Sequence, residues 1–169
     1  KSLSKRDFSR VTVPLERFGV KFFFKIKNKL PLSILGTQSA EGIKYLENKG
    51  SAQCKSSIML AALNASGTTS IKAKKSRNHS ELLFKYLKIP IKIKKTKRFD
   101  FIDIKRPKKI NAFNYQIPGD ISSSAFFMVL TTLAKNSKLL IKNVNINPSR
   151  IGVVTILKKM GAQITLKNQ

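Results

Sequence analysis

The spacing of apolar positions divides the chain into amphipathic helical stretches and short alternating stretches. Apolar residues that recur every three or four positions predict helices, which we place near residues 4–18, 51–64, 78–87, 120–134 and 150–159. Alternating β-branched and aromatic residues predict strands, near residues 20–26, 31–35, 68–73, 90–96, 99–104, 112–116, 138–142 and 162–166. Because helices and strands alternate along the chain, the pattern predicts an α/β (α+β) fold.

Two of these patterns recur at a spacing of roughly seventy residues, which indicates a protein built from repeated units. In the first pattern a strand follows a helix, with Gly19, Lys88 or Gly161 at the helix C-cap. In the second, a glycine, a small polar cap, an apolar helix and a short strand follow one another at 50–72 and again at 119–142. The repeat therefore predicts an α/β module that the chain uses more than once.

A Ser-Arg pair follows each copy of the second pattern, Ser76-Arg77 first and Ser149-Arg150 later. We expect the later pair to anchor the repeat structurally. The Pro-Gly break in the segment 117–120 is the strongest candidate for a crossing between domains. Asp120 ends that segment at a helix start, where capping accounts for a carboxylate.

Composition describes a globular chain with few candidates for metal or redox chemistry. Hydrophobic residues make up 41% of the 169, yet no run approaches the ~18 apolar residues of a membrane-spanning helix. One cysteine and one histidine exclude a disulfide framework and a Cys/His metal cluster, so we expect neither metal nor cofactor. A reducing, cytoplasmic setting fits. The chain opens without a signal-peptide pattern or an initiator Met, and we expect it to be a piece of a longer protein.

The net charge of +26 admits two interpretations. A basic nucleic-acid-binding module gains affinity from every phosphate that it neutralises. Compositional drift toward lysine is the alternative, and we favour it because lysine far outnumbers arginine and tryptophan is absent. Proteins that bind nucleic acid commonly use arginine forks and exposed aromatic side chains.

The start of the helix predicted at 51–64 offers groups suited to an anion. Helix N-termini present unpaired backbone N–H groups and partial positive charge. Gly50 permits close approach, Ser51 adds a hydroxyl, Gln53 an amide and Lys55 a mobile cation. By residue type alone, ordinary capping is the better interpretation. The helix predicted at 78–87 starts with Asn78 and Glu81 in the spacing of a capping box.

Four motifs carry a resemblance to a known family. The segments SAQCKSSIMLAAL, KSRNHSELL, PGDISSSAFF and NPSRIGVVTILKKMGAQI, in this order, closely resemble the 5-enolpyruvylshikimate-3-phosphate (EPSP) synthases, also called 3-phosphoshikimate 1-carboxyvinyltransferases. The opening SLSKR looks like another segment of that family. The related UDP-N-acetylglucosamine enolpyruvyl transferase shares the fold and is the alternative. Cys54 does not match that relative's reactive cysteine, and we expect it to be a core thiol.

The resemblance implies a fold of two domains, each built from three βαβαββ units as an inside-out α/β barrel. It implies that residues 1–117 form the later part of the domain that binds shikimate 3-phosphate. Residues 118–169 would begin the return into the other domain. The fold would be incomplete, and such a piece would leave a sheet edge and apolar helix faces uncovered.

The resemblance also implies substrates and site residues. The family transfers the enolpyruvyl group of phosphoenolpyruvate to the 5-hydroxyl of shikimate 3-phosphate, in the pathway to chorismate and the aromatic amino acids. Residues that match its shikimate 3-phosphate ligands are Ser51, Gln53, Ser76 and Arg77. Arg6 and Gln53 match phosphoenolpyruvate ligands, although Asp7-Phe8 follows Arg6 where the family has Pro-Met.

The family's catalytic aspartate and lysine have no counterpart in these motifs, so we assign no catalytic residue. We expect the piece to be inactive alone. We further expect small-molecule substrates only, without nucleic acid or membrane as partners, and a monomeric parent enzyme in a bacterial-type cytoplasm.

Overall fold

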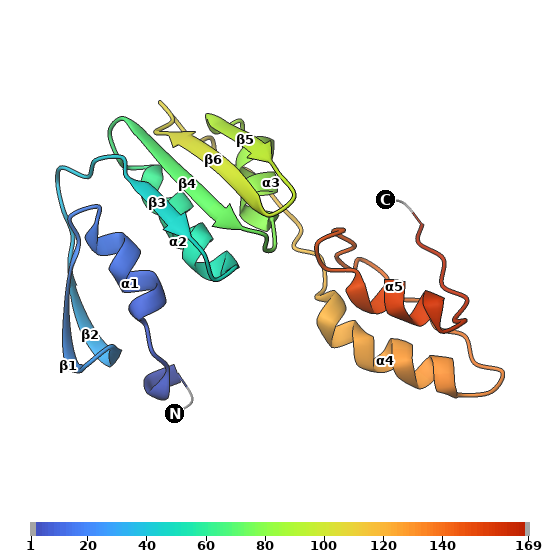
Figure 1. Ribbon diagram of the computed structural model, residues 1–169. Coiled ribbons are helices and arrows are strands. Elements are labelled where there is room, and N and C mark those ends of the chain that lie inside the picture. The colour runs from blue at the N-terminus through green and yellow to red at the C-terminus, as the bar shows by residue number, and fades with distance from the viewer. Residues whose placement is uncertain (1–2, 168–169) are drawn as a thin grey trace. The chain divides into compact units, whose positions relative to one another are not determined.

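The computed structural model describes residues 3–167 (Figure 1). Contacts between Cα atoms divide the chain into two compact units, Lys1–Asn111 and Ala112–Gln169. The assignment of residues 1–117 to the later part of a shikimate 3-phosphate-binding domain, and of residues 118–169 to the start of the return into the other domain, stays a prediction.

The first unit opens with a short helical turn, a helix and a hairpin. These are η1 (Leu3–Lys5), α1 (Ser9–Glu16), β1 (Lys21–Ile26) and β2 (Lys29–Leu35). A second set of elements follows, in the order β3 (Lys44–Glu47), α2 (Ala52–Ala62), β4 (Thr68–Lys74), α3 (His79–Tyr86), β5 (Ile91–Lys95) and β6 (Phe99–Lys105). The second set is one complete βαβαββ unit, as the resemblance implied.

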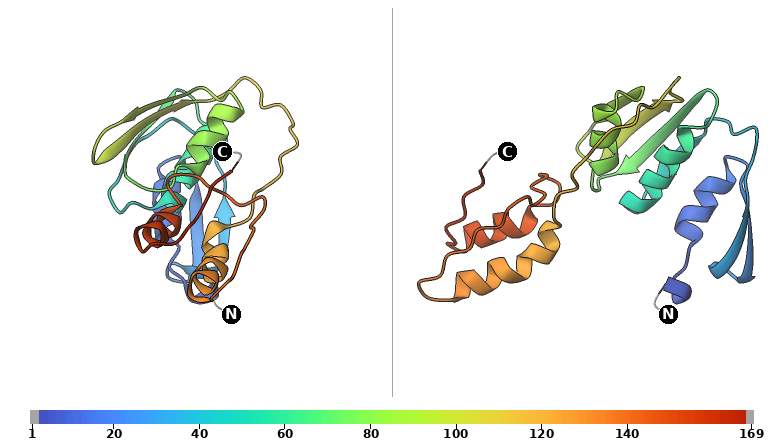
Figure 2. Two further views of the ribbon diagram at one scale, coloured as in Figure 1. Left: turned by 90° about the vertical axis from the view of Figure 1, so that its right-hand side faces the viewer. Right: turned by 180° about the vertical axis from the view of Figure 1, so that it is seen from behind.

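The sheet of this unit has the strand order β3-β4-β6-β5. The pair β3–β4 is parallel, while β6 runs antiparallel to both β4 and β5. Helices α2 and α3 lie on one face of the sheet, behind the strands in Figure 1 and in front of them in the reverse view of Figure 2. A parallel pair needs a crossover connection, and α2 provides it.

The core lies between this sheet and the two helices. Alternate residues of β4, such as Ile71 and Ala73, point inward and are buried, while Lys72 and Lys74 point outward. Helix α2 contributes Ile58 and Met59, both fully buried. Strand alternation and helical spacing therefore bring the apolar positions to one layer.

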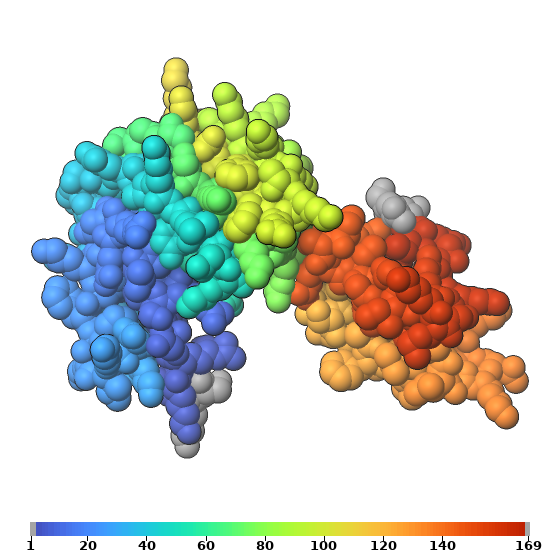
Figure 3. All heavy atoms as spheres, viewed as in Figure 1, coloured from blue at the N-terminus to red at the C-terminus, as the bar shows by residue number. Residues whose placement is uncertain are grey.

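The outer face of the sheet is the one turned toward the viewer in Figure 3, and it carries the exposed Lys72 of β4 and Lys94 of β5. The Lys72 ammonium lies over the ring of Phe99, 4.9 Å from its centroid, and 5.8 Å from that of Phe101. Aromatic rings on this face thus pack under lysine rather than in the core.

The predicted helix C-caps adopt the conformation that the repeat requires. Gly19 and Gly161 have φ angles of +93° and +95°. Lys88 takes the same left-handed conformation, with φ of +55°. All three helix ends therefore have a left-handed residue at this position, although only two have glycine.

The second unit contains α4 (Ile121–Leu133) and α5 (Gly152–Lys159). The strands predicted at 112–116, 138–142 and 162–166 are wrong, since none of these segments is a strand. Within the described part of this unit, the only ladder pairing is a parallel bridge between Gly119 and Val144. Alternation makes a segment suitable for a strand, but a strand forms only where a partner satisfies its backbone groups.

Three further sequence predictions need correction. The helix predicted at 4–18 is interrupted, because Asp7 accepts a hydrogen bond from the Ser9 N–H (2.7 Å) and α1 starts there. Strand β3 was missed: it is short and lies at the sheet edge. The capping box at α3 is wrong, because Asn78 makes no side-chain capping bond and Glu81 binds Lys55 instead. Among residues 3–167, no helix combines the length and apolar character needed to cross a membrane.

Candidate functional site

A tight turn places the start of α2 against the end of β4. The buried Glu47 carboxylate accepts hydrogen bonds from the Lys49 N–H (3.0 Å) and the Gly50 N–H (2.9 Å). Gly50 has φ of +70°, and a Cβ there would lie 3.1 Å from the Lys75 carbonyl oxygen. Two segments far apart in sequence therefore meet here, and only glycine fits the turn without strain.

Ser51 caps α2, as the residue pattern predicted. Its backbone is extended, and its Oγ accepts a hydrogen bond from the Cys54 N–H at 3.3 Å. Gln53 follows in the first turn with its side chain exposed. The early N–H groups of such a helix have no intrahelical acceptor and favour an anion. The exposed Gln53 thus belongs to the same helix start that Ser51 caps.

Ser76 and Arg77 lie in the loop between β4 and α3. The Ser76 Oγ is buried and has no hydrogen-bond partner in the described structure. The Arg77 side chain is exposed, and its backbone carbonyl accepts a hydrogen bond from the Lys55 ammonium at 2.8 Å. Because Lys55 is the fourth residue of α2, this bond joins the loop directly to the helix that Ser51 caps.

Lys55 is not the mobile cation that we expected. Its side chain is 1% exposed, and its Nζ also donates to Glu81 Oε1 at 2.5 Å. The reason is helical geometry: Lys55 shares one face of α2 with Ile58, Met59 and Ala62, all of which are buried. Lys55 lies three, four and seven residues before these apolar residues, a spacing that indicates the same inward face.

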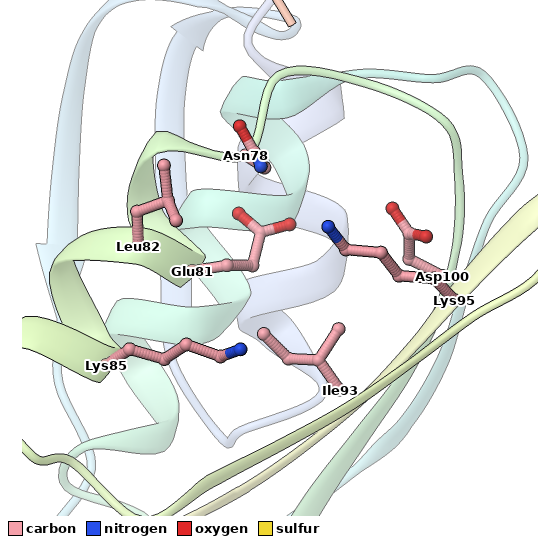
Figure 4. A pocket seen from close by; sticks show the side chains of 7 residues that line it. All are labelled: Asn78, Glu81, Leu82, Lys85, Ile93, Lys95 and Asp100. Atoms are coloured by element: carbon pink, nitrogen blue, oxygen red, sulfur yellow. The ribbon is translucent and has the colours of Figure 1, made fainter. Parts of the chain in front are cut away.

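A second contact ties α2 to α3. The hydroxyls of Ser56 and Ser80 are 2.6 Å apart and share a hydrogen bond. Glu81 also lines a small pocket between α3 and the sheet (Figure 4), and its lining residues are Asn78, Glu81, Leu82, Lys85, Ile93, Lys95 and Asp100. The Asp100 carboxylate is bound to the Lys75 ammonium at 2.6 Å. This pocket is separate from the start of α2 and contains none of the predicted ligands.

Arg6 is the predicted ligand that the structure does not join to the others. It is exposed in the turn after η1, and no described hydrogen bond or ion pair links it to Ser51, Gln53, Ser76 or Arg77. The neighbouring Asp7 serves the start of α1. Hydrogen bonds from the side chain and backbone of Ser9 hold the pKa of Asp7 below its ordinary value.

Cys54 is a core thiol, as expected. It is 5% exposed, and burial raises the pKa of its thiol above the ordinary value. A buried protonated thiol is a poor nucleophile. Among the residues that the structure describes, no group of three His, Cys, Asp or Glu side chains could hold a metal ion.

The arrangement suits binding of an anion more than acid–base chemistry. Backbone N–H groups, two serine hydroxyls, an amide and a guanidinium lie around the start of α2 and the following loop. The buried carboxylates nearby, Glu47 and Glu81, are already engaged by backbone N–H groups and by Lys55. A guanidinium with paired donors matches a phosphate geometrically.

A βαβαββ sheet with an anion-suited helix start defines an α/β protein of the enolpyruvyl transferase type. Comparison makes the relationship specific, since the sequence profile of EPSP synthase (3-phosphoshikimate 1-carboxyvinyltransferase) matches residues 1–169. The chain belongs to the EPSP synthase family. The sugar-nucleotide alternative is not favoured, because the matching profile and the similar proteins carry the shikimate enzyme's name.

The 3-phosphoshikimate 1-carboxyvinyltransferases of Petrotoga mobilis and Ruthia magnifica are 41% and 43% identical to this chain. Each alignment covers 99% of the chain, but only 39% and 38% of those proteins. The EPSP synthase of Acinetobacter baumannii superposes with a TM-score of 0.81 at 38% identity, over 99% of this chain and 37% of that one. The chain thus spans about 39% of the length of its relatives.

Proposed function

We propose that this chain forms part of the shikimate 3-phosphate-binding half of a 3-phosphoshikimate 1-carboxyvinyltransferase. The observation that carries the proposal is local. Arg77 presents an exposed guanidinium beside the buried Ser76 hydroxyl, which has no partner in the described structure. Family membership makes shikimate 3-phosphate the anion that these groups fit.

Each residue has a distinct role in this proposal. Arg77 pairs with the phosphate through two N–H groups, and Ser76 donates its hydroxyl hydrogen to a phosphate oxygen. Ser51 and the early N–H groups of α2 stabilise the same negative charge. Gln53 bonds the substrate and lies near phosphoenolpyruvate, whose charge Arg6 neutralises.

In the reaction, the 5-oxygen of shikimate 3-phosphate forms a bond to the central carbon of phosphoenolpyruvate and loses its proton. The methylene carbon gains a proton, which gives a tetrahedral intermediate. Loss of phosphate and of one methyl proton then restores the double bond. Such steps need acid–base groups and preorganised charge, and the residues described here supply binding groups only.

The remaining parts of the proposal concern setting and partners. Both substrates are small anions, to which the net charge of +26 supplies a favourable long-range field. A cytoplasmic, monomeric enzyme without nucleic-acid or membrane partners is part of the same proposal. Duplex DNA binding should therefore be weak and without sequence preference, with affinity falling steeply as salt rises.

Calorimetric titration with shikimate 3-phosphate, using the protein as its gene encodes it, tests this function. We expect wild-type protein to bind, and Arg77→Ala and Gln53→Ala to bind on the order of tenfold more weakly, since each removes a hydrogen bond to a charged group. Arg150→Ala is the matched control, because it removes the arginine of the second Ser-Arg pair. Equal affinity of all variants would show that the site assignment is wrong.

A further inference from the structure

The Lys55–Glu81 pair is the most deeply buried ionic contact among the described residues, with side-chain exposures of 1% and 5%. The second carboxylate oxygen, Glu81 Oε2, is buried and has no hydrogen-bond partner in the described structure. A buried pair of this kind is rarely better for stability than apolar side chains of similar volume. Stability alone is therefore a weak reason for a lysine at this position.

The second hydrogen bond of Lys55 gives the lysine another consequence. Its Nζ donates to the backbone carbonyl of Arg77, and this is the only hydrogen bond that the structure describes for Arg77. The loop is also held on either side: Lys75 binds Asp100, and Ser80 binds Ser56. At Arg77 itself, the described tie between the loop and the rest of the fold comes from Lys55.

We propose that Lys55 is a positioning residue for the anion site. Its ammonium fixes the main chain at Arg77 and so directs the Arg77 guanidinium and the Ser76 hydroxyl toward the anion at the start of α2. Lys55 does not contact the anion, because it lies on the buried face of the helix. This inference rests on the proposed function, since it assigns a support to the same binding site.

Charge balance explains the division of roles. Glu81 neutralises Lys55 at 2.5 Å, so the buried lysine contributes little to the attraction of a phosphate. The exposed Arg77 provides that attraction. Lys55 and Glu81 thus form a neutral internal support, and a change that removes both charges tests position separately from electrostatics.

Wild-type protein and two variants separate these effects, each prepared at the full length that the gene encodes. Lys55→Met combined with Glu81→Leu removes both buried charges, so the free energy of unfolding should stay near or above the wild-type value. The Arg77 carbonyl loses its donor, and the dissociation constant for shikimate 3-phosphate should rise on the order of tenfold. Glu81→Gln is the complementary variant: it weakens the pair but keeps Lys55 on Arg77, so stability should fall while affinity stays near wild type.

Urea unfolding and calorimetric titration give the two readouts, and the KM for each substrate and kcat give a third. We expect the double variant to raise the KM for shikimate 3-phosphate more than it lowers kcat. Wild-type affinity in the folded double variant would overturn this inference alone, as would a loss of affinity in Glu81→Gln that tracks its loss of stability. Absence of binding by wild-type protein would overturn the proposed function, and this inference with it.

Discussion

The chain contains two versions of one helix start, and they use their arginines differently. In the second version, Arg150 Nη2 donates to Asp120 Oδ1 at 2.9 Å and to Ser122 Oγ at 2.5 Å. In the first version, the cap is the uncharged Ser51, and no described carboxylate pairs with Arg77. A carboxylate at the cap neutralises the arginine internally, while a serine there leaves the arginine able to bind an external anion.

The two versions also differ in how their helices are covered. Helix α2 packs against the sheet and buries Ile58 and Met59. Helix α4 exposes a run of large apolar side chains, including Phe126 (79% exposed) and Leu133 (78%). The first version has its strands and the second lacks them, so only the first has a sheet to cover its helix. This contrast agrees with the expected exposure of apolar faces in an incomplete repeat.

The largest difference in stability should appear when Lys55 and Ser124 are changed, which lie five residues after Gly50 and Gly119 respectively. Lys55→Met alone leaves the buried Glu81 carboxylate without its cation, which should lower the free energy of unfolding by about 3–5 kcal/mol. Urea denaturation measures this loss. Ser124→Ala removes only a 3.3 Å bond from an exposed hydroxyl to the Asp120 carbonyl, and its midpoint should hardly move. Similar losses from both changes would contradict the contrast.

The paired glycines should give the next effect. Gly50→Ala adds a Cβ at a left-handed residue and 3.1 Å from the Lys75 carbonyl oxygen, so we expect a loss of roughly 1–3 kcal/mol. Gly119→Ala adds one at ordinary contact distance, 3.5 Å from the Asn143 carbonyl oxygen, without a positive φ. In thermal unfolding, Gly50→Ala should have a clearly lower midpoint temperature than Gly119→Ala. The reverse order would show that the two turns do not differ in this way.

Exchanging the caps tests the proposed reason for the different arginines. Ser51→Asp keeps a good helix cap but places a carboxylate at the start of α2, as Asp120 does at α4. The new charge repels phosphate and is a potential partner for Arg77, so affinity for shikimate 3-phosphate should fall on the order of tenfold. Ser51→Asn caps without charge and offers an amide donor in place of the hydroxyl, so its loss of affinity should be clearly smaller than that of Ser51→Asp. Equal affinities of the two variants would show that the charge of the cap does not affect anion binding, and would contradict the proposed reason.

The smallest expected effect is a loss of local stability at low pH, where the Asp120 carboxylate becomes protonated. Hydrogen bonds from the Ser122 N–H and then from Arg150 hold the pKa of Asp120 below its ordinary value. A carboxyl whose pKa is depressed by folding adds stability above its unfolded pKa, and this stability is lost as the pH falls through the folded pKa. The protection factors of amides in the first turn of α4 against hydrogen exchange should therefore fall in acid, below the ordinary aspartate range. The first turn of α2, capped by Ser51, should not share this step, and Asp120→Asn should abolish it at α4.

Much of the first unit could be predicted from the sequence. Helical spacing and strand alternation located α2, β4, α3, β5 and β6, because each has a buried face with the matching period. The position of Lys88 at a helix C-cap followed from its alignment with Gly19 and Gly161, and its left-handed conformation agrees with it. The Ser51 and Asp120 caps followed from residue type and position.

Other features depend on partners that no local pattern contains. Alternation suggested strands at 112–116 and 138–142, but whether a strand forms is decided by a neighbouring strand. Lys55 was expected to be mobile because lysine is usually exposed. Its spacing from Ile58, Met59 and Ala62 places it on the buried face of α2, but the partner that neutralises a charge there, Glu81, lies on another helix. The unpaired Ser76 hydroxyl likewise depends on packing around the loop rather than on its neighbours in sequence.

The outer face of the sheet shows how a chain with a net charge of +26 still forms strands. Across β6, Phe101 lies between Lys72 of β4 and Lys94 of β5, and Asp103 lies between Ser70 and Lys92. The middle strand thus keeps the lysines of its two neighbours from lying directly opposite one another, an arrangement that would be destabilising. Lysine could accumulate on the flanking strands because β6 separates them, and β6 is therefore the strand of this sheet on which a further lysine would be tolerated least.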